Sequence, residues 1–256
     1  MAIPIAAEPI FNIGSFSITN TLLDTLLIDV LLFALIIFIS RGVKYIPGTL
    51  QNIVEIAVET YYNLIESITP KRVKEIFPIA MTFFLFILLI NWSGLLPGVG
   101  TIGIFETHGN EKTLVPLIRA ASSDLNLTLA LGIISVFATH VMSIKFTGIK
   151  DYLSRYFSLN PINLFVGLLE IVLEFAKIVS FSFRLFGNIF AGEVVIFTVA
   201  GMFAFFFPLP FMVLEIIVGA VQALVFSMLT MAFMVIFTTP HHQDKHTAGQ
   251  KLAAAV

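Results

Sequence analysis

Two segments of this chain carry no formal charge over the length of a membrane span. Residues 76–96 and 125–144 are 21 and 20 residues long, and neither contains Asp, Glu, Lys or Arg. A helix that crosses a bilayer needs about 20 consecutive, predominantly apolar residues. Only 12% of the 256 residues are charged and 58% are hydrophobic, whereas about a quarter of a soluble domain is charged. The chain therefore belongs to the membrane class.

Several function classes are excluded by what the sequence lacks. There is no cysteine, which rules out disulfides and thiol catalysis, and a net charge of −2 gives no reason to expect nucleic acid as a partner. The GxGxxG match at 98–103 follows an apolar helix without a strand, so we expect a turn there. The chain has no GxxxxGK[ST], HExxH or GxSxG motif, so we expect neither a P-loop nor an intramembrane hydrolase.

Three further segments are candidates for membrane helices. Residues 21–40 form a first span, and residues 161–207 and 211–239 are longer than one upright crossing needs. At about 1.5 Å per residue, residues 161–207 would extend about 70 Å, against about 30 Å of hydrocarbon. This segment either crosses twice, turning near Gly187 or Gly192, or crosses once with a strong tilt.

The segment between the first two spans has a different pattern. Residues 48–68 place apolar side chains at helical spacing opposite an acidic face. The pattern predicts an amphipathic helix that lies along the membrane surface or packs on a neighbour.

Loop charges predict the orientation. If residues 161–207 cross once, ten Lys and Arg residues lie on one side of the membrane and only Lys112 and Arg119 on the other. The side with more cations is the cytoplasmic one by the positive-inside rule. We therefore expect one polytopic domain over residues 1–256, with five crossings, the N-terminus outside and the C-terminus in the cytoplasm.

A stripe of polar residues runs through the 161–207 segment. Glu170, Lys177 and Arg184 recur every seven residues, and Glu174 and Asn188 each follow a stripe member by four residues. In the last segment Glu215 and Gln222 are also seven apart. One interpretation is a bundle with internally satisfied polar groups, in which Glu174 and Lys177 form an ion pair. The other interpretation is that the stripe lines an ion path.

Arg184 favours the second interpretation. An arginine at mid-membrane costs about 2.5–3.5 kcal/mol on insertion scales, and no acid lies three or four residues from it. Glu193, nine residues later, points to roughly the opposite helix face. Carboxylates and amides could form a hydrated path, and a permanently charged guanidinium could act as its electrostatic gate.

Specific strings carry a family resemblance. The string FRLFGNIFAGE at 183–193, with Glu170 before it and VQALVFSML at 221–229 after it, resembles subunit a of bacterial F-type ATP synthase. NWSGLLPG at 91–98 and SSDLNLTLALG at 122–132 support the same resemblance, which covers residues 21–239. The resemblance implies a non-catalytic, proton-translocating stator subunit of the F0 sector, in a bacterial cell membrane.

The resemblance also assigns a fold and residue roles. It implies an all-α membrane protein with about five membrane helices and an amphipathic surface helix, the last two helices forming a tilted hairpin against a rotor ring. Arg184 would face this ring of c subunits, and Glu170 would line the cytoplasmic half-channel. The outer half-channel would contain Asn188, Glu193, Glu215 and Gln222. Asp124, Glu174 and Lys177 are possible further lining residues. The implied partners are the c-ring, the b subunits of the peripheral stalk, the lipid bilayer and, indirectly, the F1 sector.

The chain departs from many relatives at one point. A histidine often occupies the position of either Glu193 or Glu215, and here both are glutamate. If helix packing brings the two carboxyl groups within a few ångströms, we expect them to share one proton and act as a relay.

The remaining expectations are plainer. Asp124 is expected to cap the helix that follows it, and His140 to be a hydrogen-bonded residue near a helix end. His241, His242 and His246 lie in a polar tail, and we expect no metal and no cofactor. A stand-alone secondary ion transporter is the alternative function, although the chain has no internal repeat of the kind common in such proteins.

Overall fold

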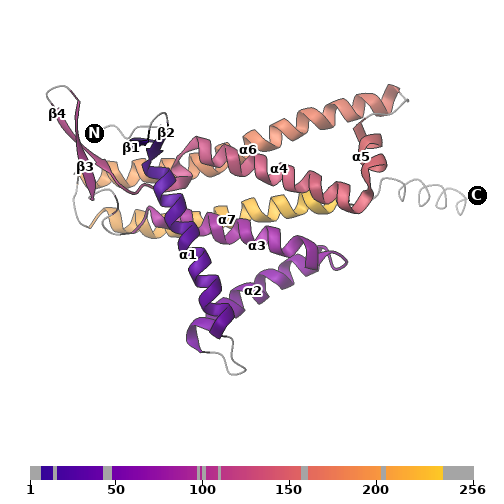
Figure 1. Cartoon of the computed structure of the whole chain (residues 1–256), viewed down its shortest axis with the longest axis horizontal. Coiled ribbons are helices and arrows are strands. Elements are labelled where there is room, and N and C mark those ends of the chain that lie inside the picture. Colours follow the sequence, from indigo (N-terminus) through magenta and orange to yellow (C-terminus); the bar gives the residue numbers. More distant parts are fainter. Residues whose placement is uncertain are drawn as a thin grey trace, which may run out of the picture.

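The computed structural model describes residues 7–13, 16–42, 48–96, 99, 102–108, 111–156, 161–202 and 206–238. Within them lie seven α-helices, a short 3₁₀ helix and two β-hairpins (Figure 1). The helices are α1 (Asn20–Gly42), α2 (Thr49–Ile68), α3 (Val73–Ser93), α4 (Leu125–Thr147), α5 (Ile149–Tyr156), α6 (Pro161–Met202) and α7 (Pro208–Thr238), and η1 is Ala121–Ser123.

Four of the described helices are long and apolar enough to cross a membrane: α1, α3, α4 and α7. All four correspond to predicted segments, although α3 and α7 each begin three residues before the predicted starts at residues 76 and 211. The predicted amphipathic segment is the helix α2. These elements confirm the prediction of an all-α membrane protein.

The long predicted segment is one continuous helix. α6 has 42 residues, so it is about 63 Å long, and both Gly187 and Gly192 lie inside it. The prolines at 208 and 210, expected to separate the last two segments, instead begin α7. Proline suits the first turn of a helix, where its missing N–H would have had no partner. α6 and α7 lie side by side as a hairpin (Figure 1).

Two antiparallel hairpins were not predicted. β1 (Pro9–Ile13) pairs with β2 (Phe16–Thr19), and β3 (Gly103–His108) pairs with β4 (Glu111–Pro116). Both hairpins lie at one end of the helix bundle, opposite α5 (Figure 1). Half of the turn expected at 98–103 lies outside the described residues, and the Val99 amide donates to the Leu96 carbonyl as in a turn. The strands have four to six residues each, too short for a periodic pattern to distinguish them from loops.

The helices pack around two groups of buried apolar side chains. The first group joins α1, α3, α4, α6 and α7, with Ile87, Leu185 and Phe226 almost fully buried. The second joins α2, α3, α4 and α7 around Ile65, Ile76 and other side chains. α7 lies against α3, α4 and α6, and its Glu215 and Gln222 side chains are buried.

Polar side chains connect the helices at the end of the bundle where the two β-hairpins lie. One oxygen of the buried Asp24 accepts hydrogen bonds from the Ser93 hydroxyl at 2.7 Å and the Ala121 amide at 3.0 Å. Asp124 caps α4 as predicted, because its carboxylate accepts the Asn126 amide. Such bonds hold membrane helices together where the hydrophobic effect between helices is weak.

The outward surface is strongly apolar. On α1, Val30, Phe33 and Phe38 are each about 70% exposed, and α6 also turns large apolar side chains outward. A soluble protein would bury such groups, whereas a bilayer covers them with hydrocarbon. The exposed surface therefore agrees with a multi-pass membrane protein.

Tyr61 attaches α2 to the bundle, and its removal should have a measurable cost. Its hydroxyl lies 2.7 Å from the Ser227 Oγ of α7, and burial raises its pKa to about 12. We expect Tyr61→Phe to lower the free energy of unfolding by about 1 kcal/mol at neutral pH. The difference in unfolding free energy between the parent and Tyr61→Phe should shrink as pH rises from about 10 to about 12. In this range Tyr61 ionises in the unfolded chain but not in the folded one, which lowers the stability of the parent and leaves that of the variant unchanged.

Thermal unfolding in detergent micelles across pH measures this effect. Tyr62→Phe is the matched control, since Tyr62 is only half-buried and packs against the Phe77 ring. Equal effects of the two substitutions would contradict a specific role for the Tyr61 hydroxyl.

Candidate functional site

α6 carries charged side chains at three levels along its length. Glu170, Glu174 and Lys177 lie near the α5 end, Arg184 lies in the middle, and Glu193 lies towards the hairpin end. Glu170 is 14 residues before Arg184 and Glu193 is nine after it, which corresponds to about 21 Å and about 14 Å along the axis. Arg184 is therefore the one charged residue of α6 between these two polar regions.

Arg184 is exposed on the outer surface of the α6–α7 hairpin. Its Nη2 lies 3.4 Å from the Ser180 Oγ, a weak contact one helical turn away. Among the described residues, no acidic side chain lies within ion-pair distance of its guanidinium. A permanent cation thus faces outward from an apolar surface without a carboxylate partner in its own chain.

One turn further, an amide pair joins α6 to α7. The Asn188 Nδ2 donates a hydrogen bond of 2.8 Å to the Gln222 Oε1. Gln222 is buried, whereas Asn188 is exposed on the same surface as Arg184. The predicted polar faces of the two helices therefore meet at this level.

A second contact between these helices holds Glu215. A Cβ added to Gly192 would overlap the carboxyl group of Glu215, so only glycine leaves room for this carboxyl group against α6. Glu215 is 5% exposed, and its Oε1 has no hydrogen-bond partner within the described structure. Such a buried acceptor needs a hydrogen-bond donor, for example a water molecule, to satisfy it.

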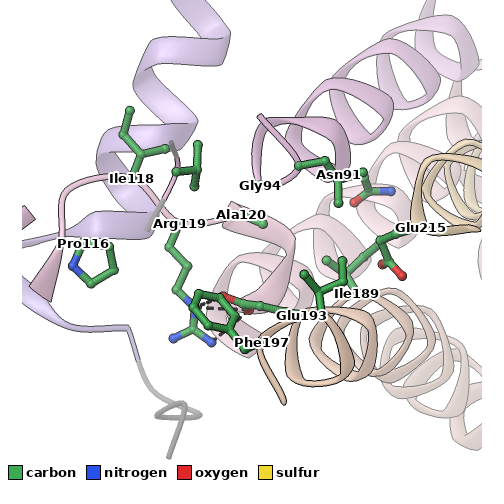
Figure 2. A pocket seen from close by; sticks show the side chains of 13 residues that line it. Asn91, Gly94, Pro116, Ile118, Arg119, Ala120, Ile189, Glu193, Phe197 and Glu215 are labelled. Atoms are coloured by element: carbon green, nitrogen blue, oxygen red, sulfur yellow. Dashed lines mark hydrogen bonds and ion pairs between the residues drawn. The ribbon is translucent and has the colours of Figure 1, made fainter. Parts of the chain in front are cut away.

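Glu215 opens into a pocket at the hairpin end. Figure 2 shows Arg119 and Glu193 meeting in this pocket, with Asn91 and Glu215 on the side nearer α7. The Arg119 Nε and Nη2 lie 3.2 Å and 3.3 Å from the two Glu193 oxygens, and Arg119 is only 4% exposed. A buried two-pronged pair of this kind fixes the direction of the carboxylate. Glu193 and Glu215 thus line one pocket, but Glu193 has a cationic partner.

A separate polar cluster lies at the α5 end. Glu174 is bonded to Lys177 at 2.8 Å, which is the i, i+3 ion pair predicted from the sequence. The other Glu174 oxygen lies 3.5 Å from the His140 Nε2 of α4. Glu170 pairs with Arg155 of α5, also at 3.5 Å. The cluster contains Glu170, Glu174 and Lys177, but its other members come from helices that sequence reasoning did not connect to it.

Four contributing residues were missed: Arg119, Gly192, His140 and Arg155. Arg119 was counted only as a loop charge. His140 was correctly expected to be hydrogen-bonded near a helix end, but not to contact Glu174. The side chain of His108 and all of His241, His242 and His246 lie outside the described residues.

Comparison with known proteins decides the family. Residues 22–235 match the model of the family described as "ATP synthase A chain". The matched range is most of the chain and includes both polar regions. The chain belongs to this family. It is therefore a non-catalytic membrane subunit that functions within the ATP synthase complex, and the family's role is that of the proton-translocating stator of the F0 sector.

Individual members of the ATP synthase A chain family can be aligned with this chain over 83% to 96% of their own length. ATP synthase subunit a of Moorella thermoacetica is 31% identical over 91% of this chain and 96% of the relative. ATP synthase subunit a 2 of a Bradyrhizobium species is 30% identical over 90% of this chain and 94% of the relative. Subunit a of Geotalea daltonii is 32% identical, over 82% and 83% respectively. A stand-alone transporter is accordingly not favoured.

The contact between Gly192 and Glu215 leads to a prediction. Gly192→Ala should leave the fold intact, because the overlapping atoms are at the end of a flexible side chain that can turn away. Because the carboxyl group of Glu215 would be displaced, proton transport should slow about tenfold. This loss is smaller than the full rate contribution of a positioned acid or base. ATP-driven acidification of inverted vesicles measures the rate. Gly187→Ala is the control, since a Cβ there meets nothing within 4 Å.

The double variant Gly192→Ala/Glu215→Asp tests the cause. The shorter aspartate should fit beside the new methyl group and recover part of the rate. Equal losses from Gly192→Ala and Gly187→Ala would contradict a positional role for Gly192.

Proposed function

We propose that this chain supplies two half-channels for protons on opposite sides of Arg184 and that protons pass between them only on a rotor ring. The observation that carries the proposal is the arrangement on α6: a pocket with Glu193 and Glu215 towards one end, a cluster with Glu170 and Glu174 towards the other, and the exposed Arg184 between them. The remaining steps follow from the chemistry of these groups.

In the outer half-channel, Glu215 is the residue best suited to hold and release a proton. Its Oε1 has no partner among the described residues, so a water molecule there would satisfy a buried acceptor and could exchange a proton with it. Glu193 is held by Arg119, whose guanidinium fixes the position and direction of its carboxylate. We assign Asn188 and Gln222 to the inner end of this path, since their amide pair lies between Glu215 and the level of Arg184. Asp124 serves as a helix cap beside it.

In the inner half-channel, Glu170 and Glu174 provide the carboxylates. Arg155 and Lys177 balance their charges, and the side chains are only 10–21% exposed. Balanced charge permits ionised groups to remain in a poorly hydrated region. A proton leaving the ring would reach cytoplasmic water through this cluster.

Arg184 separates the two paths by its charge. A cation without an internal carboxylate partner attracts an ionised carboxylate on the passing ring and favours release of its proton. The same charge repels a proton that would move directly from one half-channel to the other. The arginine thus makes rotation the only route.

We infer the membrane placement from charge and helix length. Five crossings, by α1, α3, α4, α6 and α7, place most of the cationic loops in the cytoplasm, with the N-terminus outside. With 42 residues, α6 crosses once at a strong tilt, and α2 lies along the inner surface. The single polytopic domain is located in a bacterial cell membrane.

Purification tests the partners. A tagged form of the chain should carry with it a ring of c subunits, the b subunits of the peripheral stalk and the soluble F1 sector. Vesicles with this complex should acidify on addition of ATP. Proton transport by the chain alone, reconstituted in liposomes without a ring, would instead indicate a stand-alone transporter and overturn the proposal.

A further inference from the structure

His140 occupies an unusual place in the inner cluster. It is a histidine of α4 that contacts two other helices, α5 and α6, through its two ring nitrogens. Its Nδ1 lies 3.2 Å from the Tyr152 hydroxyl, and its Nε2 lies 3.5 Å from a Glu174 oxygen. The family assignment gives this residue no role.

We propose that His140 transfers protons between cytoplasmic water and Glu174 in the inner half-channel. This inference rests on the proposed function, because it assigns the α5 end of the bundle to the cytoplasmic path. Histidine is the side chain whose ordinary ionisation falls between about pH 5 and 8, so it can both accept and release protons at cellular pH.

Both charge states of the ring can be hydrogen-bonded where it lies. In the neutral ring one nitrogen donates and the other accepts. With the proton on Nε2, the ring donates to Glu174 and accepts from the Tyr152 hydroxyl. When Nδ1 is also protonated, the hydroxyl can rotate and accept from it. Neither state leaves a buried nitrogen without a partner, so the ring can change its charge without moving.

Charged and aromatic groups from three helices surround the His140 ring. The charged neighbours are Glu174 and Lys177 of α6, with Glu170 paired to Arg155 of α5 further out. Each of the two carboxylates is thus paired with a cation, and the carboxylate of Glu174 is also within reach of the His140 ring. From α7 the ring meets only the Phe237 ring, at 5.9 Å and nearly perpendicular. Its side chain is 22% exposed, which admits water.

The proton balance of one step is simple. Water delivers a proton to the Nδ1 of the neutral ring, which becomes an imidazolium. The imidazolium then gives its Nε2 proton to the Glu174 carboxylate, leaving a neutral ring and a neutral carboxyl group. Exchange of the remaining ring proton with water restores the starting form. The reverse order carries protons outward to the cytoplasm, and no bond other than N–H and O–H changes.

Chemical rescue of His140→Ala tests the proposal. The experiment uses the whole complex in inverted vesicles made permeable to protons, so that the rate of ATP hydrolysis reports turnover of the rotor. We expect a loss of about tenfold, the small end of what a general acid or base supplies, growing as pH rises and protons become scarce. Added imidazole should restore most of the rate, because it fills the vacated space and titrates near neutral pH.

Pyrazole is the control for packing. It has nearly the shape of imidazole but does not accept a proton near neutral pH, so it should restore nothing. Rescue by both molecules would mean that His140 only fills space, and an unchanged rate in His140→Ala would also overturn the proposal. So would a loss that imidazole does not restore.

A second variant covers a failure of assembly. If His140→Ala lowers the amount of complex, His140→Gln keeps a polar side chain that cannot titrate, and it should show the same pH-dependent loss. Failure of the proposed function is distinguishable, since vesicles with the parental complex would then not acidify with ATP at all. Normal acidification together with normal His140 variants would overturn the role of His140 alone.

Discussion

Arg184→Ala should abolish proton-driven ATP synthesis, with a loss of at least about 100-fold. A loss of this order is typical when one preorganised polar group is removed from a site that depends on it. The guanidinium is exposed and has no acidic partner among the described residues, so its removal should not disturb the bundle. Without the cation, protons should leak through the membrane sector without rotation. ATP synthesis and passive proton permeability in inverted vesicles measure the two effects.

Arg184→Lys should also fail in synthesis. A lysine keeps the charge, but its ammonium is compact and flexible and cannot present a planar fork to a passing carboxylate. Arg41→Ala is the matched control, since Arg41 is an exposed arginine in the last turn of α1 and should be neutral. Near-normal synthesis by Arg184→Ala would exclude the proposed gate.

Glu215→Gln should have the second largest effect, slowing proton flux by about tenfold or more. The amide keeps the size of the side chain next to Gly192 but cannot exchange a proton. Glu193→Gln should slow flux less, because Glu193 is held by Arg119 and is less available as a carrier. Pumping rates from about pH 6 to about pH 9 compare the two variants.

A double variant separates a relay from two independent residues. If Glu193 and Glu215 act as one unit, the loss in Glu193→Gln/Glu215→Gln should be much smaller than the product of the single losses. Independent, pH-insensitive losses would contradict the relay. Arg119→Gln/Glu193→Gln removes both members of this ion pair and should show how much of the Glu193→Gln loss comes from breaking the pair.

The sequence was most informative where a single helix carries the pattern. The uncharged spans, the amphipathic helix α2 and the ion pair of Glu174 and Lys177 all follow from spacing within one helix, and the structure contains each of them. The cap at Asp124 was also predictable, because a capping side chain acts within its own turn. The roles of Arg184 and its neighbours came from the family resemblance and remain predictions.

Contacts between distant segments could not be predicted in the same way. Arg119 meets Glu193 across 74 residues, and His140 meets Glu174 across 34, through packing angles that spacing does not encode. Gly192 appeared to be a possible turn because glycine is flexible, yet its importance lies in the absent side chain, which leaves space for Glu215. The short hairpins gave no periodic signal at all.

The length of α6 has a geometric consequence for rotation. A continuous helix of 42 residues is about twice as long as the hydrocarbon is thick, so with the proposed single crossing it leans in the bilayer. Glu170 and Glu193, about 35 Å apart along it, are then displaced sideways in the plane of the membrane as well as in depth. A carrier that loads at one level and unloads at the other has to move tangentially. In the proposed arrangement, this lean would convert a voltage acting across the membrane into torque about an axis normal to the membrane, and the direction of the lean would set the sense of rotation.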